Sequence, residues 1–111
     1  MDQRVQHVVS FIRDNYQRKL TLREMAESVN LSTWWLCHIF KADTGTSPER
    51  FLARVRLEKA KNLLENSFLT VKEVMKEVGI ADAGHFSRSF KAAYGLTPAQ
   101  WREKVNRHKH S

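Results

Sequence analysis

The sequence predicts an all-α domain of about seven helices, organised as two helix-turn-helix subdomains joined by a long linker helix. Three observations support this fold class. A segment of about thirty residues occurs twice, helix-capping residues recur at matching positions in both copies, and apolar residues between the copies follow helical spacing. No segment carries a convincing strand pattern.

The composition is that of one globular domain with an excess of positive charge. Hydrophobic residues make up 41% of the 111 residues and charged residues 28%, which is typical of a soluble folded protein. The 19 Lys and Arg residues against 12 Asp and Glu give a net charge of +7 and a pI of about 9.9. This balance favours a polyanionic partner, and a merely solubilising surface charge is the alternative.

Cysteine content and hydropathy give expectations about location and cofactors. The single cysteine, Cys37, excludes an intramolecular disulfide, and the sequence contains no signal peptide or apolar run of membrane-spanning length. We therefore expect a cytoplasmic protein with no membrane partner. No cluster of residues has metal-ligand spacing, so we expect neither a metal nor another cofactor.

The two copies of the repeat are LTLREMAESVNLSTWWLCHIFKADTGTSPERF and LTVKEVMKEVGIADAGHFSRSFKAAYGLTPAQW. In each copy a Thr-x-x-Glu capping box opens a short helix, a residue that tolerates left-handed backbone ends it, and a Ser or Asp caps the next helix. These residues are Thr21, Glu24, Asn30 and Ser32 in the first copy, and Thr70, Glu73, Gly79 and Asp82 in the second. Each copy is therefore predicted to form a helix-turn-helix.

The remaining helices follow from proline positions and apolar spacing. The second helix of each copy ends at Gly45 or Gly95, and Pro48 and Pro98 then start the helices that follow. We expect a first helix through the segment from Val5 to Tyr16. The predicted organisation is a first subdomain over residues 1–46, a linker helix over 47–66 and a second subdomain over 67–111.

A helical wheel divides the second helix of each copy into an inner and an outer face. In the first copy Leu36, Ile39 and Phe40 form the core face, and Trp34, His38 and Lys41 point outward. Trp35 falls beside Ile39 and is expected to pack. In the second copy Phe86 and Phe90 point inward, while Gly84, Arg88 and Lys91 point outward. Outward basic and aromatic side chains beside a tight turn suit the major groove of DNA.

These motifs resemble the DNA-binding domain of AraC/XylS-type transcription regulators. The resemblance is carried by LTLREMAESVNLS, FKADTGTSPERF, RLEKAKNLL and above all GIADAGHFSRSFKAAYGLTPAQW, and it covers nearly the whole chain. It implies sequence-specific binding of double-stranded DNA by two recognition helices in successive major grooves. It also implies transcription regulation, more often activation, with RNA polymerase as a partner. Such regulators commonly carry a separate sensing or dimerising domain, for which 111 residues leave no room, so a longer native chain is one expectation.

The resemblance assigns the residues of the interface position by position. The expected base-reading residues are Trp34, Cys37, His38, Ala83, Gly84, Ser87 and Arg88. The expected phosphate contacts are Ser32, Thr33, Lys41, Asp82, His85 and Lys91. Cys37-His38 replaces the Ser-Arg that is frequent in the family. The first unit is thus expected to supply aromatic and polar readout, and the second to bind chiefly through Arg88 and its backbone.

Three other readings stay open at this point. For Trp34 the alternative to a thymine methyl or sugar-phosphate contact is packing against a neighbouring helix. For the whole chain the alternatives are a helical protein-interaction module and a nonspecific polyanion binder, both using the basic surface. An enzyme is not expected, because no phosphate loop, nucleophilic triad or metal-spaced cluster is present. Cys37 beside His38 would suggest an activated thiol, but adjacent side chains on a helix diverge.

Overall fold

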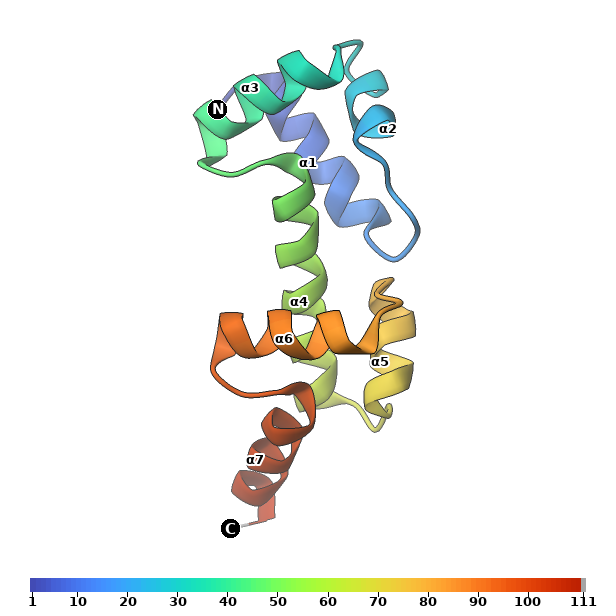
Figure 1. The fold of residues 1–111 in the computed structure, drawn as a ribbon, viewed down its shortest axis with the longest axis vertical. Coiled ribbons are helices and arrows are strands. Elements are labelled where there is room, and N and C mark those ends of the chain that lie inside the picture. The colour runs from blue at the N-terminus through green and yellow to red at the C-terminus, as the bar shows by residue number, and fades with distance from the viewer. Residues whose placement is uncertain (111) are drawn as a thin grey trace. The chain divides into compact units, whose positions relative to one another are not determined.

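The computed structural model describes residues 1–110, and the side chains of residues 1–108. The described residues form seven α-helices and no strand (Figure 1), which confirms the predicted fold class. The helices are α1 (Gln3–Asn15), α2 (Leu22–Glu27), α3 (Thr33–Thr44), α4 (Pro48–Asn66), α5 (Val71–Val78), α6 (Ala83–Tyr94) and α7 (Pro98–His110). Ser111, the last residue of the predicted second subdomain, lies outside the described residues.

The chain forms two compact units, Met1–Val55 and a second unit that begins at Arg56. The division falls inside α4, so the N-terminal half of this helix packs in the first unit and its C-terminal half in the second. Each unit therefore contains one copy of the sequence repeat and one half of the connecting helix.

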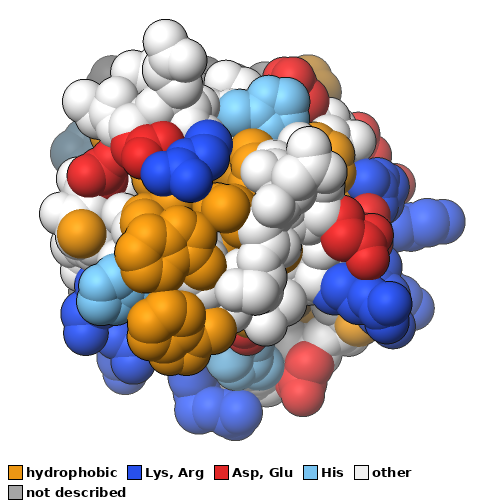
Figure 2. All heavy atoms as spheres, turned by 90° about the horizontal axis from the view of Figure 1, so that it is seen from above, with side chains coloured by type: hydrophobic (Ala, Val, Ile, Leu, Met, Phe, Trp, Pro, Cys, Tyr) orange, Lys and Arg blue, Asp and Glu red, His pale blue; other side chains and the backbone are white. Residues whose placement is uncertain are grey.

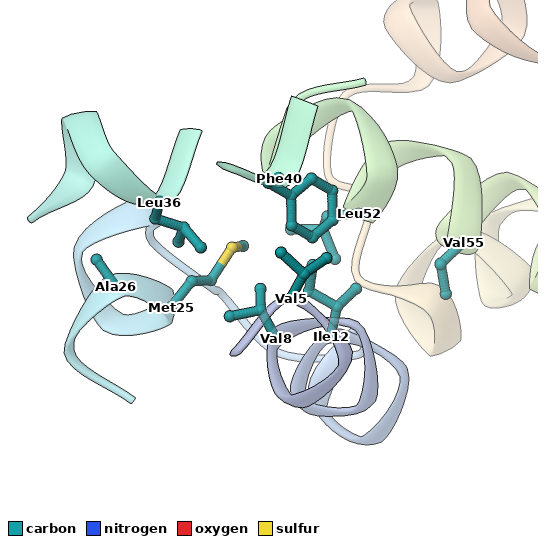
Figure 3. Close-up of a cluster of buried hydrophobic side chains, with 9 residues drawn as sticks. All are labelled: Val5, Val8, Ile12, Met25, Ala26, Leu36, Phe40, Leu52 and Val55. Carbon is teal, nitrogen blue, oxygen red and sulfur yellow. The ribbon is translucent and has the colours of Figure 1, made fainter. Parts of the chain in front are cut away.

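The core of the first unit is built from four helices (Figure 3). Helix α1 contributes apolar residues at helical spacing, and α2, α3 and the start of α4 close over them. The buried residues are Val5, Val8, Ile12, Met25, Ala26, Leu36, Phe40, Leu52 and Val55. Phe40 also meets Phe51 edge-on, with ring centroids 5.6 Å apart. The predicted inner face of α3 is thus confirmed at Leu36 and Phe40, while Ile39 is partly buried against the same core.

In the second unit the core is rich in aromatic side chains. Its buried hydrophobic residues are Ala60, Leu64, Val74, Met75, Val78, Phe86 and Phe90. The Phe90 ring lies 4.8 Å from that of Tyr94 and 6.0 Å from that of Trp101 between ring centroids, so α6 and α7 share an aromatic contact. The inner face predicted for α6, Phe86 and Phe90, is confirmed.

The turn between the two helices of each repeat has the same hydrogen-bonding pattern in both units. Asn30 and Gly79 adopt left-handed backbone with φ of 56° and 81°, as the sequence predicts. The N–H of the next residue, Leu31 or Ile80, donates to the carbonyl five residues back, on Ala26 or Met75. This pattern is a Schellman motif, which satisfies the last carbonyls of the first helix while reversing the chain.

The predicted caps of α3 and α6 are present. The Ser32 hydroxyl accepts from the Trp35 N–H at 3.1 Å, and the Asp82 carboxylate accepts from the His85 N–H at 2.9 Å. A reciprocal capping box, Thr97 with Gln100, also opens α7 and was not foreseen from the sequence.

The capping boxes predicted for the two repeats differ in outcome. Thr70 and Glu73 form the complete box, with side-chain to backbone bonds in both directions. In the first repeat the Thr21 hydroxyl accepts from the Glu24 N–H, but the Glu24 carboxylate pairs with Arg18 at 2.9 Å. The predicted box is therefore only half formed there, because a neighbouring guanidinium competes for the carboxylate.

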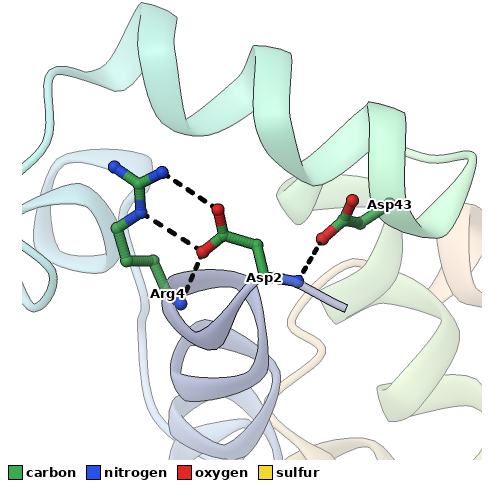
Figure 4. A network of polar contacts seen from close by, with 3 residues as sticks. All are labelled: Asp2, Arg4 and Asp43. Atoms are coloured by element: carbon green, nitrogen blue, oxygen red, sulfur yellow. Dashed lines mark hydrogen bonds and ion pairs between the residues drawn. The ribbon is translucent and has the colours of Figure 1, made fainter.

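The start of α1 is fixed by a small polar network (Figure 4). The Asp2 carboxylate accepts from the Arg4 N–H at 2.7 Å and pairs with the Arg4 guanidinium at 2.9 Å. The Asp2 N–H in turn donates to Asp43 of α3 at 2.7 Å. The side-chain and backbone hydrogen bonds from Arg4 lower the pKa of Asp2 from 3.8 to about 2.

Arg102 of α7 joins three parts of the second unit. Its guanidinium donates to carbonyl oxygens at the end of α4 and in the segment that leads to α5. The acceptors are Leu63, Leu64 and Ser67, each at 3.3 Å, and Leu69. A cation at the C-terminus of α4 also offsets the negative end of the helix dipole.

The Arg102 contacts predict a large loss of stability on truncation. Arg102→Ala is expected to lower the free energy of unfolding by about 2 to 4 kcal/mol, because it leaves several part-buried carbonyls without their charged donor. Arg107→Ala is the matched control on the same helix, since Arg107 makes only an exposed pair with Glu103 and its loss should be worth less than about 1 kcal/mol. Urea unfolding of both variants measures the difference; equal losses would contradict this role.

The lowered pKa of Asp2 predicts a pH-dependent contribution to stability. Because the folded pKa lies below the unfolded value, ionised Asp2 stabilises the fold above the unfolded value of 3.8, and this contribution disappears as the pH falls through about 2. Asp2→Asn keeps a good N-cap but does not titrate. On acidification from about pH 5 to about pH 2 the wild type should therefore lose more thermal stability than Asp2→Asn. Identical pH profiles would show that Asp2 makes no such contribution.

Candidate nucleic-acid interface

Helices α3 and α6 are held in the same way and are both exposed on their outer faces. Each begins shortly after the left-handed residue of its unit and is held by two buried side chains on its inner side, Leu36 and Phe40 or Phe86 and Phe90. Of the residues predicted for the interface, Cys37 and Ser87 are half-buried, and all others are exposed. The face of each helix that the sequence assigns to DNA is therefore on the surface of its own unit.

Three aromatic rings lie together at the start of α3. The exposed fractions of Trp34 and Trp35 are 68% and 39%. The His38 ring stacks on both, with centroid distances of 5.4 Å to Trp34 and 5.5 Å to Trp35, and the two indoles are 5.7 Å apart. Figure 2 shows hydrophobic side chains gathered on the surface with a histidine beside them and Lys and Arg side chains around.

Trp35 packs, but against the rings of Trp34 and His38, and 39% of its surface is exposed. Trp35 is not among the side chains packed against the core of the first unit, whereas its wheel neighbour Ile39 is. Because His38 follows Trp35 by three residues and Trp34 by four, its ring meets both indoles along the helix surface. We call Trp34, Trp35 and His38 the aromatic cluster. The adjacent tryptophans could have indicated it, since two large rings on neighbouring positions cannot both enter one core.

Cys37 lies beside the aromatic cluster as a neutral group. Burial, and to a smaller extent the charge of Glu49, raise the pKa of its thiol. A raised pKa keeps the thiol protonated near neutral pH, which disfavours the activated-thiol reading. Cys37 offers DNA a small, weakly polar surface.

The start of α6 contrasts with that of α3 because it carries almost no side chain. Ala83 and Gly84 are exposed, and the guanidinium of Arg88 extends back over Gly84. A β-carbon on Gly84 would lie 3.2 Å from Nη1 of Arg88 and 3.5 Å from a carboxylate oxygen of Asp82. The longest polar side chain on this face is thus laid along the bare first turn of the helix.

Asp82 is held in its ionised form by its capping role. The hydrogen bond from the His85 backbone lowers the pKa of its carboxyl, with smaller contributions from Gly84, Arg88 and His85. An ionised carboxylate only accepts hydrogen bonds and repels phosphate. Its side chain therefore cannot donate a hydrogen bond, and its role in the structure is to cap the first turn of α6.

Lysines on the turn side of the second unit were not singled out by the sequence. Lys72 and Lys76 of α5 lie four residues apart and border a shallow open hollow. The hollow is lined by Lys72, Met75, Lys76, Gly79, Ile80 and Ala81. In a helix-turn-helix the first helix crosses the DNA backbone, so lysines on it belong with the phosphate candidates. Their spacing of four residues was the available signal.

Two features are absent from the described residues. They contain no group of three or more His, Cys, Asp or Glu side chains placed to hold a metal ion. They also contain no helix that is both long and apolar enough to cross a membrane.

Comparison with known proteins gives consistent matches. A family model described as a helix-turn-helix domain matches residues 25–104. The chain is similar to the lactose operon transcription activator of Staphylococcus xylosus, with 32% identity over 98 residues that cover 88% of this chain and 35% of that protein. It is also similar to the transcriptional activator RhaS of Escherichia fergusonii, with 32% identity over 102 residues, 92% of this chain and 37% of that protein. The chain thus spans about a third of the length of these curated relatives.

Solved structures agree with these matches. The C-terminal domain of AraT, a response regulator from Geobacillus stearothermophilus, superimposes with a TM-score of 0.87 at 32% identity, covering 93% of this chain and 86% of that one. The DNA-binding domain of AdpA, solved in complex with a target DNA, superimposes with a TM-score of 0.90 over 96% of each chain. At 22% identity the likeness to AdpA shows the fold.

Two repeated helix-turn-helix units with exposed second helices define a DNA-binding domain of the helix-turn-helix class. The family match and the identities above 30% over most of the chain identify the family within this class. The chain belongs to the AraC/XylS family of transcription regulators and matches the helix-turn-helix domain of that family.

The glycine in the first turn of α6 predicts a stability change of known sign. Gly84→Ala should raise the free energy of unfolding by up to about 1 kcal/mol, because alanine loses less backbone entropy in a helix. Nη1 of Arg88 is the end of a flexible side chain and moves aside. Ala83→Gly, at the exposed neighbouring position, is the matched control and should lower stability by a similar amount. Loss of stability in Gly84→Ala would show that the Arg88 contact outweighs helix propensity.

Proposed function

We propose that this chain recognises one asymmetric double-stranded DNA site by inserting α3 and α6 into successive major grooves. The observation that carries the proposal is the repeated Schellman turn, after which each unit presents a capped second helix with its outer face exposed. In this arrangement the N-terminal half of a helix reaches base edges while flanking groups contact phosphates.

The two recognition helices take different roles in the proposal. Trp34, Cys37 and His38 read bases from α3 through apolar and weakly polar contacts. On α6, Arg88 donates to a guanine, the commonest partner of an arginine fork in the major groove. Ala83, Gly84 and Ser87 let the backbone of α6 approach closely. Phosphate contacts come from Ser32, Thr33, His85, Lys41 and Lys91.

The proposal extends to the protein that contains this domain. We propose a regulator that activates transcription, contacts RNA polymerase and is joined to a sensing domain in a longer chain. Two of the relatives, the lactose operon transcription activator and RhaS, are activators, which supports this extension. Action on chromosomal DNA would place the protein in the cytoplasm. We propose no enzymatic role, in keeping with the protonated thiol of Cys37.

Selection of bound duplexes from a randomised DNA pool at near-physiological salt tests sequence-specific recognition. We expect two conserved blocks about one helical turn apart, one for each recognition helix. A single conserved block would show that only one of the two units reads bases. Bound DNA without any sequence preference, whose retention falls steeply as the salt concentration rises, would instead favour a nonspecific polyanion binder.

Variants measured on the selected duplex then separate base from phosphate contacts. Arg88→Ala should weaken binding by about 1 to 3 kcal/mol and relax the base preference at one position of the second block. Trp34→Ala should have the same effect at one position of the first block. Lys91→Ala should weaken binding to all sequences alike and reduce the salt slope by about 1. Equal, sequence-independent losses for all three variants would contradict the assignment.

A further inference from the structure

The aromatic cluster gives the outer face of α3 an apolar surface. The major groove that this face is proposed to contact is mostly polar. Trp34 is 68% exposed and Trp35 39%, and both stack on His38, which is itself exposed. At the corresponding positions α6 carries Gly84, His85 and Arg88, which offer one aromatic ring instead of three. The first unit therefore carries on its surface a large hydrophobic area that packing in the core does not explain.

The major groove contains one apolar group that such a surface can recognise. Among the four bases only thymine presents a methyl group there, at C5; cytosine presents an amino donor and a C5 hydrogen, and the purines present acceptors and an amino group. The faces of the indoles have no hydrogen-bonding groups, and each ring has a single N–H at its edge. Contact with a C5-methyl removes apolar surface from water on both sides, whereas contact with a phosphate would remove water from a charge.

The stacking makes the three rings one surface. His38 lies within 5.5 Å of both indoles, centroid to centroid, with interplanar angles of 10° and 17°. Each ring limits the movement of the others, so the side chains lose less conformational freedom when DNA binds. Trp35 thereby joins Trp34 in the contact surface, and His38, besides its own base contact, holds the two indoles in place.

We propose that the aromatic cluster selects the C5-methyl group of a pyrimidine in the major groove. The proposal rests on the proposed DNA-binding function and gives the first unit its chemical preference. Because 5-methylcytosine carries the same methyl group in the same place as thymine, the first unit also distinguishes methylated from unmethylated cytosine. Cytosine methylation at the target site therefore strengthens binding.

The test changes the DNA by one methyl group at a time. Starting from the duplex selected above, each thymine of the block read by α3 is replaced by uracil, and the dissociation constant is measured at fixed salt. At one or two positions the loss of the methyl should weaken binding about four-fold, as expected for one methyl-sized apolar group left unburied. At the same positions a change from cytosine to 5-methylcytosine should tighten binding by a similar factor.

Protein variants assign the effect to the cluster. In Trp34→Ala the difference between thymine and uracil should vanish, and in Trp35→Ala and His38→Ala it should shrink. Arg88→Ala, on the other recognition helix, is the control and should keep the full difference while binding more weakly. Circular dichroism of each variant verifies that it folds. Because Trp34 is exposed, its truncation should leave the core of the first unit intact.

The outcomes separate this proposal from the proposed function. Selected, sequence-specific binding with no thymine–uracil difference in the first block would overturn methyl selection and leave the DNA-binding function standing. A difference that persists unchanged in Trp34→Ala would also overturn it, since the methyl would then contact another group. Failure to select any duplex would overturn the proposed function, and methyl selection with it.

Discussion

The left-handed residue at the end of α2 and of α5 is the constraint on which the rest of each unit depends. With Asn30 or Gly79 at positive φ, the next amide reaches back to the first helix, and the chain leaves in a new direction. The following helix then buries one face on the unit and leaves the opposite face in solvent. In a more gradual turn the orphan carbonyls would need water, and the angle between the two helices would not be fixed. The recognition surface is therefore a product of the turn as much as of the side chains on it.

The two units solve the same packing problem with different surface chemistry. Leu36 and Phe40 have direct counterparts in Phe86 and Phe90, so the inner faces are interchangeable in kind. The outer faces are not, because three stacked rings occupy the start of α3 and an arginine lies over a glycine at the start of α6. Apolar contact discriminates modestly and without strict direction, while a guanidinium fork discriminates through fixed hydrogen-bond geometry. The net charge of +7 adds attraction to any duplex and distinguishes none.

What the sequence predicted well is what short-range chemistry determines. The caps at Ser32 and Asp82, the left-handed residues and the inner faces of α3 and α6 involve groups within a few residues of each other, so spacing alone specifies them. Arg102 bonds to carbonyls more than thirty residues away, and the half-formed box at Thr21 depends on Arg18. The Arg102 contacts have no local signal, and the Arg18–Glu24 pair lies across a turn whose geometry the capping pattern does not specify. The wheel placed Trp35 beside Ile39 but did not predict its stacking partners, because a wheel gives the direction of the Cα–Cβ bond and not where a long aromatic side chain ends.

The different outer faces of α3 and α6 set the direction in which the chain lies on the proposed DNA site. If both recognition helices had the same outer face, the two blocks of the proposed site would carry the same base preference. With an apolar reader on one helix and a polar reader on the other, reversing the chain would set Arg88 against the base that the aromatic cluster prefers. In the reversed complex an apolar surface would face an unsatisfied base edge, and a guanidinium would face a methyl group. Both contacts are unfavourable, so the reversed complex loses binding free energy at both blocks of the site. Orientation is thus specified within a single chain, without a second copy to impose it.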